Sequence, residues 1–271
     1  MNTPNLSEFI KAYDVRGLVP EQLNDAVATA IGSAFAQVVA LPDGAESIVV
    51  GHDMRPSSPD LARAFARGAA AHGLDVTLIG LCSTDGLYYA SGALGVPGAM
   101  FTASHNPARY NGIKLCRSQA RPVGQDSGLA EVRDLAQQLL DDGADQPAEA
   151  TGRVGAISER DLLGDYAGFL RGLVDLSGSR PLKVVVDAGN GMGGHTVPAV
   201  LGSSESAGSA PDGAAALTPL PLDVVPLYFE LDGTFPNHEA NPLEPENLRD
   251  LQRAVVEHGA CLLYTSPSPR D

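Results

Sequence analysis

Hydrophobic residues recur along the first part of the chain with the two periods expected of helices and of buried strands. Apolar residues return at steps of three and four between residues 20 and 40, which predicts a helix. The residues that define this period are Leu23, Val27, Ile31, Ala34 and Val38. Segments 47–53 (SIVVGHD) and 75–79 (DVTLI) are short and rich in β-branched residues, and predict buried strands. Between them, the Ser-Pro-Asp run at 58–60 is typical of a helix start and Gly73 of a helix end. A strand, a helix and a strand within about thirty residues predict a βαβ unit in a parallel sheet.

The same alternation returns in the second half of the chain. Helices are predicted over 126–142, 161–174 and 244–259, a buried strand over 182–187 and an extended segment over 222–229. The polar, proline-containing stretch 143–153 is typical of a linker, and the Ser-, Ala- and Gly-rich stretch 202–216 predicts a mobile surface loop.

These patterns predict the α/β class, with two consecutive three-layer domains built on mixed or parallel sheets. We assign residues 1–150 to the first domain and 151–260 to a second, incomplete domain. After Ala260 only Cys261-Leu262-Leu263 could start another strand before a Ser- and Pro-rich ending. Residues 261–271 are therefore interpreted as an atypical, non-native tail.

Composition excludes several classes of protein. The 271 residues are 44% hydrophobic and carry a net charge of −15, and this acidic field argues against nucleic-acid and anionic-membrane partners. The three cysteines contain no CxxC pair, so neither a disulfide framework nor a zinc ribbon is expected, and the cytoplasm is the predicted compartment. The N-terminus carries acids and lacks the apolar core of a signal peptide, and no apolar run is long enough to span a membrane.

One stretch departs from this acidic average. Residues 86–125 contain no Asp or Glu, but they do contain basic residues, namely Arg109, Lys114, Arg117 and Arg121. A cationic island in an acidic protein is a place where a small anionic substrate would bind, because the local field attracts it there. Chance clustering is the alternative.

Ser104 lies inside this island, after a run (GAMFTA) that predicts a strand. Ligands bind at the carboxyl ends of strands in open α/β sheets. The Asn-Pro pair at 106–107 and the Asn-Gly pair at 111–112 predict two turns of a hairpin that brings Lys114 back toward Ser104. A hydroxyl beside a cation suits phosphoryl transfer, which depends on positioning and on charge neutralisation. The alternative is that the Ser104 and Asn106 side chains only satisfy hydrogen bonds of the turn.

His105 adjoins Ser104, and side chains of neighbouring residues in an extended segment point apart. A Ser–His hydrolytic pair is therefore not predicted, and the chain contains no GxSxG motif. His105 is interpreted as a hydrogen-bond partner of the loop backbone or of a phosphate.

A competing motif, Gly189 to Gly194, follows the pattern G-x-G-x-x-G after a predicted strand and could indicate a dinucleotide site. Asp187 comes just before the glycines and would repel a pyrophosphate, so a tight strand-to-helix turn is the favoured interpretation.

Two Asp/Arg pairs indicate a function less specifically. Asp14 and Arg16 are interpreted as a surface ion pair, whereas Asp53 and Arg55 follow a strand and either cap the next helix or reach the site.

Taken together, these segments resemble the α-D-phosphohexomutases, specifically the phosphomannomutase/phosphoglucomutase branch. The matching stretches are KAYDVRG (11–17), GHDMRPSS (51–58), TASHNPARYNGIKL (102–115), VVVDAGNGMGG (184–194) and ELDGTFPNHEANPLEPENL (230–248). The resemblance covers residues 8–260 and the first two of the four domains of that family.

The resemblance implies a phosphohexomutase, which moves phosphate between C6 and C1 of mannose or glucose through a hexose 1,6-bisphosphate. Ser104 is then the phosphoserine, Lys114 the general acid/base, and His105 and Arg16 further catalytic residues. Tyr13 and Arg109 are then substrate-binding residues. Mg²⁺ would bind Ser104 through a phosphate oxygen, together with three aspartates of a DGDxDR loop.

That aspartate loop does not occur in the sequence. We therefore expect an N-terminal fragment of a mutase, monomeric and inactive or nearly so alone. Two alternatives stay open. One is a two-domain phosphoserine carrier or regulatory module, and the other is a dinucleotide-binding oxidoreductase that uses the glycine motif.

Overall fold

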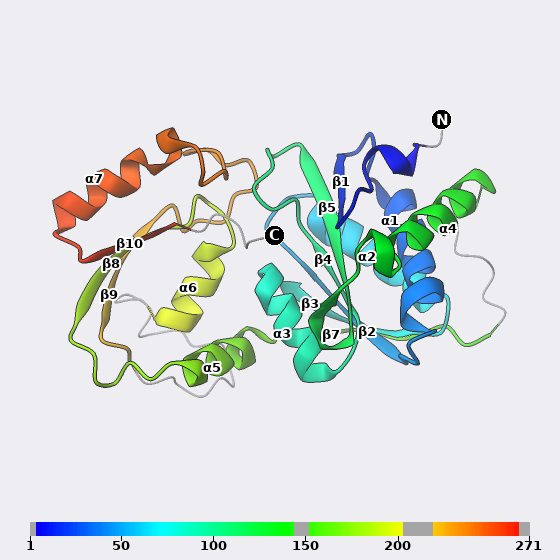
Figure 1. The fold of residues 1–271 in the computed structure, drawn as a ribbon, viewed down its shortest axis with the longest axis horizontal. Coiled ribbons are helices and arrows are strands. Elements are labelled where there is room, and N and C mark those ends of the chain that lie inside the picture. Colours follow the sequence, from blue (N-terminus) through cyan, green and yellow to red (C-terminus); the bar gives the residue numbers. More distant parts are fainter. Residues whose placement is uncertain (1–3, 144–151, 203–218, 266–271) are drawn as a thin grey trace. The chain divides into compact units, whose positions relative to one another are not determined.

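A mixed seven-stranded sheet forms the centre of the first half of the chain in the computed structural model, which describes residues 4–143, 152–202 and 219–265 (Figure 1). The strand order is β1-β5-β4-β2-β3-β7, with β6 beside β5. The strands are β1 (Val15–Leu18), β2 (Ser47–His52), β3 (Asp75–Leu81), β4 (Gly98–Phe101), β5 (Tyr110–Arg117), β6 (Arg121–Pro122) and β7 (Ile157–Glu159). The βαβ prediction is confirmed, because β2, β3 and β4 run parallel, whereas β5 is antiparallel to both β4 and β1.

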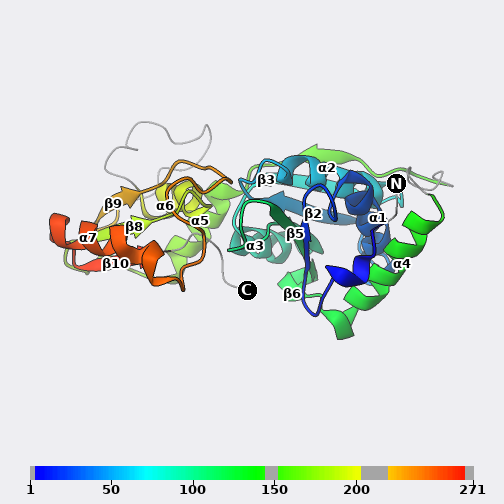
Figure 2. The same cartoon turned by 90° about the horizontal axis from the view of Figure 1, so that it is seen from above.

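Helices cover both faces of this sheet (Figure 2). They are α1 (Asp25–Phe35), α2 (Ser58–Ala70), α3 (Thr84–Leu94) and α4 (Leu129–Asp141). On one face, Ile48 and Val50 of β2 join a core with α1, α2 and α4. On the other face, Oγ of Ser91 in α3 donates to the carbonyl of Arg117 in β5 at 3.3 Å, and burial raises the pKa of the adjacent Cys116 thiol. The result is the predicted three-layer arrangement.

Helix α1 begins later than the predicted residue 20. The Asn24 side chain accepts a hydrogen bond from the Val27 amide at 3.1 Å and caps the helix there. After Phe35 the chain continues as a π-helical turn, η2 (Ala36–Ala40), so the helical path ends at the predicted residue. The remaining short helical turns are η1 (Leu6–Glu8), η3 (Ser118–Ala120), η4 (Gln125–Ser127) and η5 (Pro245–Leu248).

The second half of the chain forms a smaller parallel sheet in the order β10-β8-β9. Its elements are α5 (Leu163–Leu173), β8 (Leu182–Asp187), α6 (Gly193–Leu201), β9 (Leu222–Leu227), α7 (Arg249–His258) and β10 (Leu262–Thr265). Val184 and Val186 of β8 pack against Val197 of α6. Val185 points to the other face and packs against Leu251 of α7. The continuous apolar run of β8 is therefore explained by burial on both faces.

Two predicted boundaries differ from the structure. The chain divides into residues 1–103 with 108–161, and residues 162–271 with 104–107, rather than near residue 150. The reason is that β7 pairs with β3 and extends the first sheet.

The predicted tail begins too early, because β10 pairs with β8 through Thr265. Most of the predicted linker and of the predicted loop at 202–216 lies outside the described residues. None of the helices in the described ranges is long and apolar enough to cross a membrane.

Candidate functional site

Ser104 lies in the loop that joins β4 to β5. Its φ of 55° is in the left-handed region, which serine rarely adopts. The residue is only 5% exposed, and its Oγ lies 3.2 Å from Nδ1 of His105. The prediction that these two side chains point apart is wrong, because the left-handed backbone at Ser104 interrupts the extended alternation. The serine hydroxyl and the imidazole are therefore within hydrogen-bond distance of each other.

Both ends of this loop are fixed to the segment that follows β2. At the first end, the Asp53 amide donates to the carbonyl of Phe101, the last residue of β4, at 2.9 Å. At the second end, Nη1 of Arg55 donates to the carbonyl of Tyr110, the first residue of β5, at 2.9 Å. The backbone on both sides of Ser104 is thus held by one neighbouring loop.

A buried polar network stabilises that anchoring loop. Nε of Arg55 donates to Oδ2 of Asp53 at 3.2 Å, and Oγ of Ser58 donates to Oδ1 of the same carboxylate at 2.6 Å. Asn111 joins the network from β5 by donating to Oγ of Ser58 at 2.9 Å. Arg55 is 1% exposed, and burial lowers the pKa of its guanidinium while the charge of Asp53 opposes that shift. The Asp53 carboxylate also accepts from the Arg55 amide at 3.0 Å, so it orders the turn that leads into α2.

Asp14, Arg16 and Lys114 form a second polar cluster on the sheet. Val15 of β1 pairs with Ile113 of β5, and both face the apolar core. Their neighbours Asp14, Arg16 and Lys114 therefore point to the opposite face of the sheet. Oδ2 of Asp14 accepts from Nε of Arg16 at 2.9 Å and from Nζ of Lys114 at 3.1 Å. The predicted Asp14–Arg16 ion pair exists, but it is half-buried and it includes the predicted acid/base lysine.

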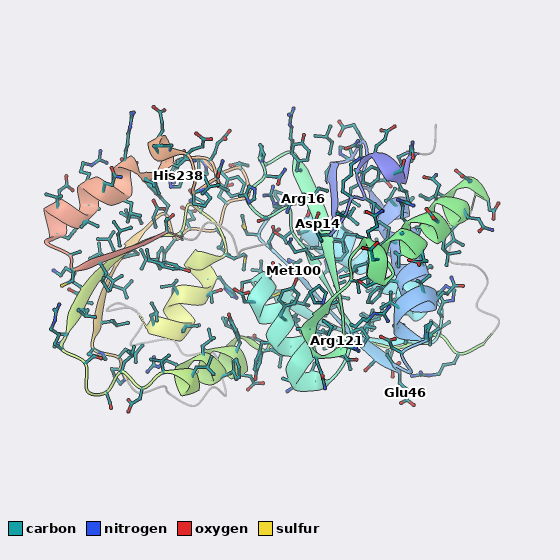
Figure 3. The ribbon with its side chains drawn as sticks, in the orientation of Figure 1. Asp14, Arg16, Glu46, Met100, Arg121 and His238 are labelled. Atoms are coloured by element: carbon teal, nitrogen blue, oxygen red, sulfur yellow. The ribbon has the colours of Figure 1, made fainter. Side chains whose placement is uncertain are left out.

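The cationic island of the sequence is not a single cluster in the structure. Arg117, at the far end of β5, donates to Asp43 at 2.6 Å and to the carbonyl of Ser127 at 2.8 Å. Figure 3 shows Arg121 at the opposite end of the hairpin from Asp14 and Arg16. Strand pairing brings Asp14 next to Lys114, and the turn after η2 brings Asp43 next to Arg117, although both acids lie outside the acid-free stretch. Counting acids along the sequence misses these partners.

The two predicted substrate-binding side chains are accessible. Tyr13 is 82% exposed, and Arg109 is exposed with its guanidinium 5.3 Å from the centre of the Tyr110 ring. Neither the tyrosine ring nor the Arg109 side chain is packed into the core, so both could reach a ligand from solvent.

The glycine motif of the second unit is a strand-to-helix turn, as the favoured interpretation predicted. The turn links β8, which ends at Asp187, to α6, which begins at Gly193. The buried Asp187 carboxylate accepts from the Gly189 amide at 2.9 Å and lies 3.1 Å from Nε2 of His238. A Cβ on Gly194 would overlap the carbonyl of Phe229, which explains that glycine by packing. A carboxylate in the turn is unfavourable for a pyrophosphate.

Two family models match the chain. The first, phosphoglucomutase/phosphomannomutase alpha/beta/alpha domain I, matches residues 8–139, and the second, alpha/beta/alpha domain II, matches residues 165–266. The chain belongs to the phosphoglucomutase/phosphomannomutase family. The match to domain II includes β10, which supports the correction of the predicted tail.

Relatives of this phosphohexomutase chain include a phosphomannomutase of Escherichia coli, 40% identical over 252 residues, which cover 92% of this chain and 51% of the relative. A Xanthomonas campestris protein described as phosphohexose mutases is 41% identical over 92% of this chain and 50% of its own length. A Burkholderia thailandensis structure of a phosphoglucomutase/phosphomannomutase family protein has a TM-score of 0.71 and 30% identity, covering 93% of this chain and 50% of that one. The chain spans about half the length of the curated relatives it matches.

The phosphohexomutase metal site is not formed by the described residues. Within the described ranges, no group of three or more His, Cys, Asp or Glu side chains could hold a metal ion. Ser104 therefore does not belong to such a group in the described part of the chain.

Proposed function

We propose that this chain carries the phosphate-transferring serine of a phosphohexomutase that interconverts hexose 6-phosphate and hexose 1-phosphate of mannose or glucose. The observation that carries the proposal is Ser104 itself. It combines a left-handed backbone, a shielded hydroxyl and an imidazole partner in a chain that matches domain I of the family.

The proposed step is transfer between Ser104 and a hexose 1,6-bisphosphate. Oγ of Ser104 attacks phosphorus, so the Oγ–P bond forms while the bond from phosphorus to the sugar oxygen breaks. The serine proton passes to Nδ1 of His105, which lies 3.2 Å from Oγ. The ammonium group of Lys114 gives a proton to the departing sugar oxygen, and Arg16 binds the sugar phosphate. In the full cycle, phosphorylated Ser104 passes its phosphate to the free hydroxyl of a hexose 1-phosphate. Ser104 then takes the other phosphate of the resulting bisphosphate, which leaves hexose 6-phosphate.

Tyr13 and Arg109 are the proposed contacts to the sugar and its distal phosphate. Mg²⁺ is the metal expected from the family, and the phosphate on Ser104 would be its ligand from the described part of the chain.

Phosphate transfer to Ser104 can be measured without turnover. The purified chain is incubated with glucose 1,6-bisphosphate and its intact mass is recorded. We expect a gain of one phosphoryl group that is lost in Ser104→Ala and kept in the matched variant Ser118→Ala, which changes a serine just after β5. A phosphate that persists in Ser104→Ala, or no phosphate in any of the three proteins, contradicts the proposal.

A two-domain phosphoserine carrier predicts the same mass gain, so conversion of glucose 1-phosphate to glucose 6-phosphate is assayed in parallel. Phosphate on Ser104 with no conversion supports the carrier. Conversion supports a mutase that is active as this chain, and it overturns the sequence-based expectation that the chain is inactive alone.

A further inference from the structure

One carboxylate oxygen of the first unit binds two cationic side chains. Oδ2 of Asp14 lies 2.9 Å from Nε of Arg16 and 3.1 Å from Nζ of Lys114, so the two nitrogens are at most 6.0 Å apart. The side chains of Asp14 and Lys114 are 13% and 10% exposed, respectively, so water screens this pair poorly. The carboxylate is thus a shared partner of two positive groups that would otherwise repel each other.

The sheet register fixes the Asp14 backbone. Arg16 pairs with Gly112 and Val15 with Ile113, so Asp14 precedes the ladder on the side of Lys114. Gly112 makes this close approach possible, because a Cβ there would overlap the carbonyl oxygen of Val15 and lie 2.7 Å from that of Thr102. The short Asp14 side chain is therefore presented from the residue immediately before β1.

Lys114 needs such a partner more than Arg16 does. Lysine carries its charge at the end of a flexible four-carbon chain, so a single acceptor of fixed position removes much of its freedom. Lys114 also lies opposite Met100 of β4, the strand that leads into the Ser104 loop. Fixing the ammonium group therefore fixes it relative to the hairpin that carries the serine.

We propose that Asp14 is a positioning residue, which holds the Lys114 ammonium and the Arg16 guanidinium in their working orientation through a single oxygen. It does not touch the transferred phosphoryl group. The functional part of this inference rests on the function proposed above, whereas the structural part, that Asp14 orders Lys114, does not.

The structural part has a direct spectroscopic test, because Lys11, Lys114 and Lys183 are the three lysines of the chain. With ¹³C-labelled lysine, the ε-methylene group of an ordered side chain gives two separate proton shifts, and that of a mobile side chain gives one averaged shift. We expect two shifts for Lys114 that merge in Asp14→Ala and move closer in Asp14→Asn, with Lys11 and Lys183 unchanged.

Asp43→Asn is the matched control. It removes the acid from the Asp43–Arg117 ion pair, whose arginine lies on the same strand β5 as Lys114. The side chains of Asp43 and Arg117 are 25% and 22% exposed, respectively. We expect the Lys114 signals to stay as in the parent chain, and Asp14→Glu to restore their separation in part. Unchanged Lys114 shifts in both Asp14→Ala and Asp14→Asn, with the chain folded by circular dichroism, overturn the proposal.

The functional part is tested by the rate of phosphate transfer from glucose 1,6-bisphosphate to Ser104. We expect Asp14→Ala to slow it by about tenfold to a hundredfold, since misplacing a reacting group by an ångström has effects of that size. Asp43→Asn leaves the rate unchanged. If the parent chain takes up no phosphate, the proposed function fails, and the Lys114 shifts still decide whether Asp14 orders the lysine. If transfer is unaffected by Asp14→Ala, the positioning role fails while the proposed function stands.

Discussion

Replacing Gly112 with alanine tests how closely the strands around the site are packed. The Cβ of the new residue would overlap the carbonyl oxygen of Val15 and would lie 2.7 Å from that of Thr102. Neither oxygen belongs to a flexible side chain, so β1 or the end of β4 has to move. We expect Gly112→Ala to destabilise the first unit and to displace Asp14 from Lys114.

The geometry sets the size of this effect. The Thr102 oxygen must retreat by 0.7 Å to reach the 3.4 Å at which ordinary contact begins, and the Val15 oxygen must move further. Thr102 also donates its amide to the Gly112 carbonyl at 3.0 Å, so the movement strains a hydrogen bond of the hairpin. Overpacking of this kind costs about 3 kcal/mol. With a urea slope of about 2 kcal/mol per M, the midpoint falls by about 1.5 M.

The assay is urea unfolding followed by far-ultraviolet circular dichroism, since the chain has no tryptophan. Hydrogen exchange of peptides from residues 9–18 and 182–202 then separates the two units, and only the first peptide should exchange faster. Gly92→Ala is the matched control. A Cβ on Gly92, in α3, meets nothing within 4 Å, so alanine should stabilise that helix by about 0.5–1 kcal/mol.

Gly112→Ala is therefore expected to lower the free energy of unfolding, and Gly92→Ala to raise it. A Gly112→Ala chain that unfolds at the same urea concentration as the parent, with unchanged exchange in residues 9–18, refutes the close approach of β1 to Gly112. The fixed position of Asp14 would then lose its structural basis.

Two further predictions concern buried and hydrogen-bonded groups. Arg55→Met leaves the Asp53 carboxylate buried without its cation and releases the Tyr110 carbonyl, so we expect a loss of about 3–5 kcal/mol in urea unfolding; a loss below about 1 kcal/mol contradicts this. Tyr228 donates to Asp250 at 2.6 Å, which raises the pKa of the phenol from 10.0 to about 12. The unfolded chain then loses this proton first, so stability should fall as the pH rises from 10 to 12. Tyr228→Phe should abolish that fall and cost about 1–2 kcal/mol at pH 8, and an unchanged pH dependence contradicts the assignment.

The central strands and most helices were predictable because burial leaves a local pattern. The segments SIVVGHD and LKVVVD carry continuous apolar runs; LKVVVD forms a strand at the predicted residues, and SIVVGHD does so except for its last residue, Asp53. β7 was missed because all three of its residues are exposed and resemble a loop. Helix α3 was missed because its sequence, TDGLYYASGAL, mixes glycines with a short apolar pattern.

The site was predictable only where its residues are close in sequence. The hairpin that relates Ser104 to Lys114 was predicted, but its second turn was placed wrongly, because Asn111 and Gly112 lie within β5 and pair with β1. The Asp14–Lys114 contact joins residues 100 positions apart, and it depends on the pairing of β1 with β5, which no local signal specifies. The contact of Ser104 with His105 was missed for a different reason, because a left-handed serine cannot be foreseen from the TASHNP sequence.

That left-handed serine also restricts which amino acids can occupy position 104. A threonine would offer the same hydroxyl, but its branched Cβ crowds the backbone at a φ of 55°. Asparagine and aspartate tolerate this region better than other non-glycine residues. An aspartate at position 104 could thus mimic the negative charge of a phosphorylated serine at little conformational cost. A threonine acceptor, in contrast, would require the loop to change shape first.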